Sequence, residues 1–179
     1  RAYTTGGGFA VNGTLYPGSP TTAGTATITT GNLTGTGTIA VRLQSATVYD
    51  SVSLTAGNAT LSTLNLSITT SYTPIFGQQF TIINTPAGGV TGPFASVTSV
   101  TPTVSYVPTY NAQSVVLTYT LNLTSPTLGL SPAQLGVGQS LSSSTPSDDL
   151  TVVNTAIGNL ATADGVRAAF DEISPAKLE

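Results

Sequence analysis

Charged side chains are almost absent from most of this chain. Only 6% of its 179 residues are charged, against about 25% in an ordinary soluble domain. The first 147 residues contain three such side chains, those of Arg1, Arg42 and Asp50. Hydrophobic residues make up 39% of the chain, so a core can form, but the polar surface must consist of Thr, Ser, Asn and Gln. Glycosidase chemistry, which needs a pair of carboxylates, therefore has no candidate residues in this region.

Several reactive residue types are missing altogether. The chain has no Cys, which excludes disulfides and thiolate zinc sites, and no His, which removes the commonest general base and metal ligand. The net charge of −3 argues against a nucleic-acid partner, because no basic patch is present to meet phosphates. The absence of Cys also fits a bacterial surface protein that stays unbridged during export.

Short runs of β-branched residues separated by turn sequences predict strands in the first part of the chain. In the run LNLSI, Leu64, Leu66 and Ile68 alternate with polar residues, which places the apolar side chains on one face. The predicted strands are Thr25–Thr29, Gly37–Leu43, Val52–Thr55, Leu64–Ile68, Phe80–Ile83, Val104–Val107 and Ser114–Leu123.

Four of these runs recur at a nearly constant interval. Those near Ile28, Val52, Phe80 and Val104 are roughly 24 to 28 residues apart, and such a period is typical of stacked repeats. A β-solenoid accounts for the interval, with aliphatic residues stacked inside and Thr, Ser and Asn outside. The alternative is an antiparallel sandwich, in which strands follow one another every 8–12 residues.

The last part of the chain predicts three short helices. Ser131 followed by Pro132, Ser147 followed by two acids, and Thr162 are the expected N-caps. Asp148 and Asp149 fall in a first helical turn, where the helix dipole favours negative charge. We expect Ser140–Ser147 to be a flexible linker. The expected apolar stripes are Leu150, Val153, Ile157 and Leu160, then Val166, Ala169, Phe170 and Ile173, with Pro175 ending the last helix.

The order of the strand and helix segments along the chain is similar to that of a known protein family. The runs YDSVSLTAGNATLSTLNLSI, SYTPIFGQQFTII, PAGGVTGPFASV and AQSVVLTYTLN are followed by LSPAQLGVGQSL and VNTAIGNLATADGVRAAFDEISP. Over residues 25–176 this sequence resembles the C-terminal passenger region of a bacterial autotransporter, a type V secretion protein. It departs from the family at Ser62 and Thr63, where glycines are common, and at Ala133-Gln134, where an Asn-Gln pair is usual.

The resemblance implies a right-handed parallel β-helix end followed by a small helical segment. Residues 1–125 would form the solenoid, with an autochaperone-like part at about 50–125 that nucleates folding. Residues 126–179 would be a helical linker before a translocator barrel that this chain lacks. The implied partners are the upstream passenger and the barrel of the same polypeptide, and a host or neighbouring-cell surface. The implied location is the extracellular side of the bacterial outer membrane.

No catalytic, cofactor or metal residues are expected, and the protein is not expected to be an enzyme. GTGTIA at Gly35–Ala40 matches a dinucleotide fingerprint, but it leads into a predicted strand and not a helix. We expect Asp50 to close a turn beside Tyr49 and to pair with Arg42. Two functions stay open, a structural export module and a solenoid that adheres to glycans or matrix. Sugar stacking is the less favoured role for Tyr3, Tyr16, Tyr106, Tyr110 and Tyr119, which we expect to pack on strands.

Overall fold

The computed structural model describes residues 2–3, 8–29, 31–72, 74–99, 103–144, 147–160 and 162–174. The chain divides into two compact units. Unit 1 consists of Arg1–Pro74, Gln78–Ser99 and Tyr106–Thr118. Unit 2 consists of Ile75–Gly77, Val100–Ser105 and Tyr119–Glu179.

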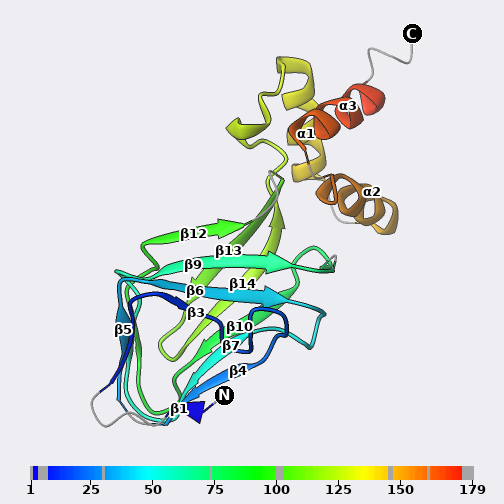
Figure 1. The fold of residues 1–179 in the computed structure, drawn as a ribbon. Coiled ribbons are helices and arrows are strands. Elements are labelled where there is room, and N and C mark those ends of the chain that lie inside the picture. The colour runs from blue at the N-terminus through cyan, green and yellow to red at the C-terminus, as the bar shows by residue number, and fades with distance from the viewer. Residues whose placement is uncertain are drawn as a thin grey trace. The chain divides into compact units, whose positions relative to one another are not determined.

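Unit 1 is a parallel β-solenoid of about three turns, in which the chain passes repeatedly through three sheets (Figure 1). Sheet A contains β1 (Ala2–Tyr3), β4 (Thr25–Ile28), β7 (Ser51–Leu54) and β10 (Gln79–Asn84). Sheet B contains β2 (Phe9–Val11), β5 (Leu33–Gly35), β8 (Ala59–Thr60) and β11 (Val90–Thr91). Sheet C contains β3 (Thr14–Leu15), β6 (Thr38–Leu43), β9 (Asn65–Thr70) and β12 (Ser96–Ser99).

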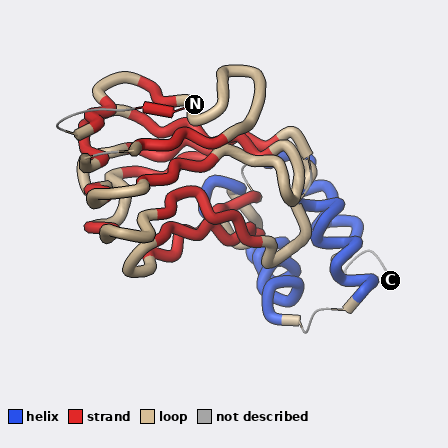
Figure 2. Tube along the Cα trace, turned by 90° about the horizontal axis from the view of Figure 1, so that it is seen from below, coloured by secondary structure: helices blue, strands red, loops and turns tan. Residues whose placement is uncertain are grey.

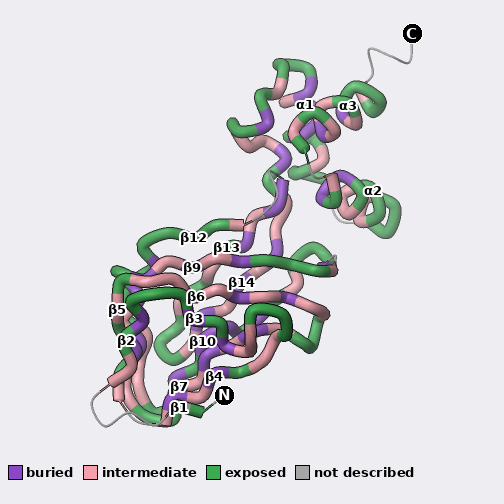
Figure 3. The backbone as a smooth tube through the Cα atoms, viewed as in Figure 1, coloured by how far each residue is buried: buried purple, intermediate pink, exposed green. Residues whose placement is uncertain are grey.

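The register between neighbouring coils places aliphatic residues of one coil beside aliphatic residues of the next. Ile39 pairs with Leu66 and Val41 with Ile68, and all four side chains are at most 1% exposed. The alternation predicted for Leu64, Leu66 and Ile68 is confirmed, because these three residues are buried while the intervening residues of β9 are half-buried. Buried and half-buried residues alternate in the same way along β6. Each buried aliphatic side chain contributes about 1.5–3 kcal/mol to folding, and Figure 3 marks the buried residues along the strands in purple. The parallel pairs exclude the antiparallel sandwich.

The turn between sheets A and B repeats a glycine–asparagine pair. The Oδ1 atom of Asn32 accepts a hydrogen bond from the backbone N–H of Asn58 at 2.8 Å, and Oδ1 of Asn58 accepts one from Gly89 at 2.8 Å. We call these three residues the amide column. A Cβ on Gly57 would lie 2.2 Å from the carbonyl oxygen of Gly31, so only glycine allows the coils to stack this closely.

The fourth predicted repeat is wrong, because the run at Val104 starts a hairpin and not another coil. β13 (Val104–Tyr110) and β14 (Ser114–Leu121) are adjacent in sheet A, and β14 pairs antiparallel with β10, with Leu117 opposite Phe80. Three residues join the two strands, whereas a parallel crossover needs a dozen or more. Most of this hairpin, Tyr106–Thr118, belongs to unit 1.

Unit 2 contains the helical segment, comprising η1 (Pro126–Leu128), α1 (Pro132–Ser143), α2 (Asp148–Gly158) and α3 (Ala163–Ile173), drawn in blue in Figure 2. The predicted N-caps Ser131, Ser147 and Thr162 are confirmed, and Ser131 also forms a capping box with Gln134. The predicted linker is wrong in part, because residues 140–143 form the last turn of α1. Pro175 lies outside the described residues.

The helices share a small core. Its buried members are Leu123, Leu128, Val137, Ile157, Val166 and Phe170. Two residues of the predicted stripes are more exposed than expected, Val153 at 36% and Ile173 at 42%. Among the described residues, no helix is long and apolar enough to cross a membrane.

Candidate functional site

Asp50 is completely buried in unit 1 and satisfies three backbone donors. Its Oδ1 accepts hydrogen bonds from the N–H groups of Gly18 at 3.0 Å and Gly24 at 2.7 Å, and its Oδ2 accepts one from Arg42 at 3.0 Å. The carboxylate therefore organises the 16–24 loop, which connects β3 to β4. This role extends the turn-closing role expected from the sequence.

The expected pairing between Asp50 and Arg42 runs through the backbone, and the guanidinium of Arg42 has other partners. Its Nη1 donates to the carbonyl of Ser19 at 3.1 Å, and its Nη2 donates to the carbonyl of Pro20. The side chain of Gln44 accepts a hydrogen bond from the N–H of Ala23 at 3.0 Å. The same loop is thus held by three side chains from the coil that stacks against it.

The glycine-rich motif at Gly35–Ala40 lies between two strands, β5 and β6. Its glycines are explained by coil stacking, since a Cβ on Gly35 or Gly37 would lie 2.1 Å from the carbonyl oxygen of Val11 or Gly13. The motif lacks the following helix whose N-terminus would hold a pyrophosphate.

The acids of the helical segment are dispersed. Asp148 and Asp149 are exposed in the first turn of α2, as predicted. Asp164 pairs with Arg167 within α3, and Asp171 accepts a hydrogen bond from Gln134 at 2.9 Å. Among the described residues, no three His, Cys, Asp or Glu side chains are grouped so that they could hold a metal ion.

The tyrosines considered for sugar stacking have different environments. Tyr106 and Tyr119 are only 4% and 3% exposed, which agrees with strand packing. Tyr110 is half-buried, and its hydroxyl accepts a hydrogen bond from the N–H of Phe94 at 3.0 Å. Tyr16 is 37% exposed. The side chain of Tyr3 lies outside the described part of the chain.

The hairpin turn is fastened to the last coil of the solenoid. The N–H of Thr85 donates to the carbonyl of Gln113 at 2.8 Å, and the N–H of Val90 donates to that of Ala112 at 3.0 Å. The side chain of Gln113 in turn donates to the carbonyl of Pro86 at 2.9 Å. Together with the β10–β14 pairing, these bonds cover the edges of sheets A and B at this end.

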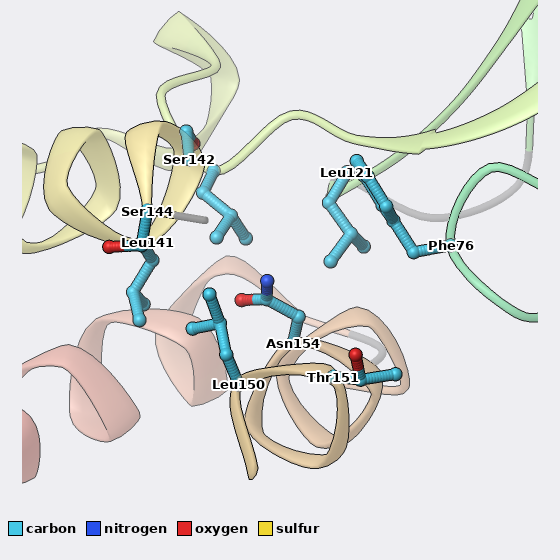
Figure 4. Close-up of a pocket in the computed structure, with 9 residues that line it drawn as sticks. Phe76, Leu121, Leu141, Ser142, Ser144, Leu150, Thr151 and Asn154 are labelled. Atoms are coloured by element: carbon cyan, nitrogen blue, oxygen red, sulfur yellow. The ribbon is translucent and has the colours of Figure 1, made fainter. Parts of the chain in front are cut away.

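Unit 2 has a small cavity of about 70 Å³ lined mainly by apolar side chains (Figure 4). Leu121, Leu141, Leu150 and Phe76 surround the amide of Asn154, which points into the space between them. The Oδ1 atom of Asn154 is buried and has no hydrogen-bond partner among the described residues. Sequence reasoning missed this cavity, because its residues come from three distant segments with no shared motif.

Comparisons of the chain with protein-family models, with curated proteins and with solved structures give no match. The described residues define a class, a parallel β-solenoid in which an antiparallel hairpin extends one of the three sheets, accompanied by a helical unit.

Proposed function

We propose that this chain is a non-catalytic structural module at the end of a bacterial autotransporter passenger. In this role the solenoid, a right-handed parallel β-helix, nucleates folding on the extracellular side of the outer membrane. The helical segment then links the passenger to a downstream translocator barrel. The sequence resemblance over residues 25–176 suggests the role, and the difference between the two ends of the solenoid supports it.

At the hairpin end, β14 pairs with β10 in sheet A and the carbonyl of Ala112 accepts a hydrogen bond from Val90 of β11, while β12 is the outermost strand of sheet C. At the other end, β2 and β3 are the outermost strands of sheets B and C. Gly13 shows that this second end has spare room. Gly13 precedes β3 as Gly37 precedes β6, and Gly37 must lack a Cβ because the carbonyl of Gly13 stacks on it. No described atom lies within 4 Å of a Cβ built on Gly13. An upstream coil with a carbonyl at this position would explain the glycine.

A covered end suits a folding nucleus. Repeat arrays grow by adding coils to an existing one, so the first coil to fold needs its own stabilising contacts. The β13–β14 hairpin joins strands that are adjacent in sequence, and such local contacts form quickly. Upstream coils would then add to the open strands, and their folding outside the cell would bias the threading chain outward.

Surface display of the full-length polypeptide tests the proposal. Deleting Val104–Leu123 removes both strands that cover the solenoid, and we expect the passenger to be lost from the cell surface, as measured by added protease or antibody. The control is Thr109→Ala, an exposed position in β13. Normal display of the deleted protein would refute the nucleating role.

A second test concerns the upstream coil. In the 179-residue chain Gly13→Ala should range from neutral to about 1 kcal/mol stabilising, because no described atom lies within 4 Å of the new methyl group. In the longer polypeptide the same change should destabilise the solenoid as strongly as Gly37→Ala does. Equal tolerance of Gly13→Ala in both proteins would contradict stacking at this end.

Adhesion through the solenoid face is the second candidate function, because Tyr16 is exposed beside a polar hollow on sheet C. Binding of the isolated chain to a glycan or matrix array would favour adhesion. Spontaneous refolding to a denaturant-resistant state with no ligand would favour the scaffold role.

A further inference from the structure

The outer face of sheet C carries a hollow of about 260 Å³ in unit 1. The 16–24 loop contributes its rim, and β6 and β9 contribute its floor. The lining residues are Tyr16, Pro20, Ala40, Arg42, Ser67 and Thr69.

The floor of the hollow follows from strand register. Ala40 lies opposite Ser67, and Arg42 lies opposite Thr69, with inward-facing aliphatic residues between them. Ala40 and Ser67 are small, so the floor is low where they pair, while Arg42 is long and half-buried. This arrangement leaves a recess in an otherwise continuous face of short side chains.

The rim is held in place before any ligand arrives. The loop that carries Tyr16 and Pro20 is fixed by the Asp50 carboxylate through Gly18 and Gly24, and by the Arg42 guanidinium through the carbonyls of Ser19 and Pro20. Binding to a preorganised site loses little conformational entropy. The exposed ring of Tyr16 is therefore presented in a defined position.

Polar groups in the hollow have unused bonding capacity. The hydroxyls of Tyr16, Ser67 and Thr69 have no hydrogen-bond partner among the described residues. A guanidinium has five N–H donors, and the two carbonyls of the loop leave part of that set available. Asp50, the single acid in the sequence of unit 1, accepts hydrogen bonds from three backbone N–H groups.

We propose that this hollow binds a saccharide that carries a carboxylate or sulfate group. The Tyr16 ring supplies an apolar face for the sugar ring, and the hydroxyls of Ser67 and Thr69 bond its hydroxyl groups. The Arg42 guanidinium holds the anionic group through charge-assisted hydrogen bonds. This site rests on the second candidate function, adhesion, and it is independent of the folding-nucleus role, which the surface-display experiment tests separately.

Amide chemical-shift titrations of the labelled chain with three matched probes test this inference. The probes are trigalacturonate, a sulfated galactotriose and neutral galactotriose. We expect at least one charged probe to bind about ten-fold more tightly than the neutral one, because only charged probes engage Arg42. A preference for one charged probe would support the inference and identify the anionic group.

Variants assign the binding to the hollow. Arg42→Gln should abolish the preference for charged probes, and Arg42→Lys should retain part of it, because the charge stays while the planar donor set is lost. Tyr16→Ala should lower the affinity of the chain for all three probes about five-fold. Arg167→Gln, which removes a positive charge from unit 2, should bind the probes as the parent chain does. Unchanged amide shifts at Gly18 and Gly24 show that the loop is intact in each variant.

Three outcomes would overturn the inference. One is equal affinity for charged and neutral probes, and another is no saturable binding at about 10 mM probe. The third is equal binding of triglutamate, which would show a general preference for acids and no recognition of sugar.

Discussion

At the residue scale, Asp50 illustrates why a chain with so few charges still retains one in its interior. A buried carboxylate is tolerated only when its charge is compensated by hydrogen bonds, and Asp50 has three from backbone donors. Those donors belong to two different parts of the fold, the 16–24 loop and β6. The side chain therefore joins parts of the chain that are not held together by strand pairing.

We expect Asp50→Asn to lower the free energy of unfolding by about 2–3 kcal/mol. The amide NH₂ would face at least one backbone N–H where an oxygen now accepts, and a buried donor would lose its partner. Urea unfolding followed by circular dichroism measures the change.

Asp148→Asn is the matched control for Asp50→Asn. Asp148 is exposed in the first turn of α2, so the same chemical change should cost at most about 1 kcal/mol through the helix dipole. Equal effects of the two substitutions would show that the three bonds to Asp50 contribute little.

Asn154 presents the opposite case, because its buried Oδ1 atom has no hydrogen-bond partner in the part of the chain that the structure describes. We expect Asn154→Leu to raise the stability of unit 2 by about 1–2 kcal/mol, because it removes the unpaired acceptor and adds apolar atoms to the cavity. The midpoint of helical unfolding measures this effect. Val152→Leu, at a 69% exposed position on the same helix, should change stability by less than about 0.5 kcal/mol.

At the element scale, the long strands and the helix caps follow from the sequence, whereas the shortest strands and the hairpin do not. β6 and β9 are long enough for alternation to be visible, and each cap rests on a single residue type. β5 and β8 have three and two residues, too few to show a period. Val104 follows the preceding predicted strand at the interval expected of another coil. Only the three-residue turn before Ser114 distinguishes the hairpin from such a coil.

The hollow could be foreseen only in part. From the sequence, Tyr16 is one of five tyrosines considered for sugar stacking, whereas Arg42 is expected only to pair with Asp50, and nothing in the sequence joins the two. Their proximity depends on the loop geometry set by Asp50, which is a tertiary effect.

Coil stacking gives a prediction at this scale. Gly37→Ala should destabilise unit 1 by about 3 kcal/mol, because its methyl group would lie 2.1 Å from a backbone carbonyl oxygen that cannot easily move. Thermal unfolding measures the loss. Gly13→Ala is the control in the same chain and should range from neutral to about 1 kcal/mol stabilising. A tolerated Gly37→Ala would contradict the close approach of the coils.

At the scale of the whole molecule, the chain has no histidine and therefore no side chain with an ordinary pKa near 6.5. Burial raises the pKa of the Tyr72 phenol in unit 1 and of the Tyr119 phenol in unit 2 above the ordinary 10.0. As pH rises past 10, the unfolded chain releases these protons before the folded chain does. Stability is thus fully present below pH 10 and falls above it.

We therefore expect the urea midpoint to stay nearly constant between about pH 6 and 9 and to fall at about pH 11. Tyr119→Phe should reduce the fall for unit 2, because phenylalanine has no proton to lose. Absorbance of the ionised phenols, recorded during the same titration, links the fall to these groups. A midpoint at pH 11 equal to that at pH 7 would contradict the prediction.

The amide column gives the solenoid a direction. At each step the later coil donates an N–H and the earlier coil offers a side-chain carbonyl, from Asn32 to Asn58 and from Asn58 to Gly89. Gly89 donates its backbone N–H to Asn58, but it has no side-chain carbonyl that could accept a bond from a further coil. The column of side-chain amides therefore stops at the same coil in which β10 pairs antiparallel with β14.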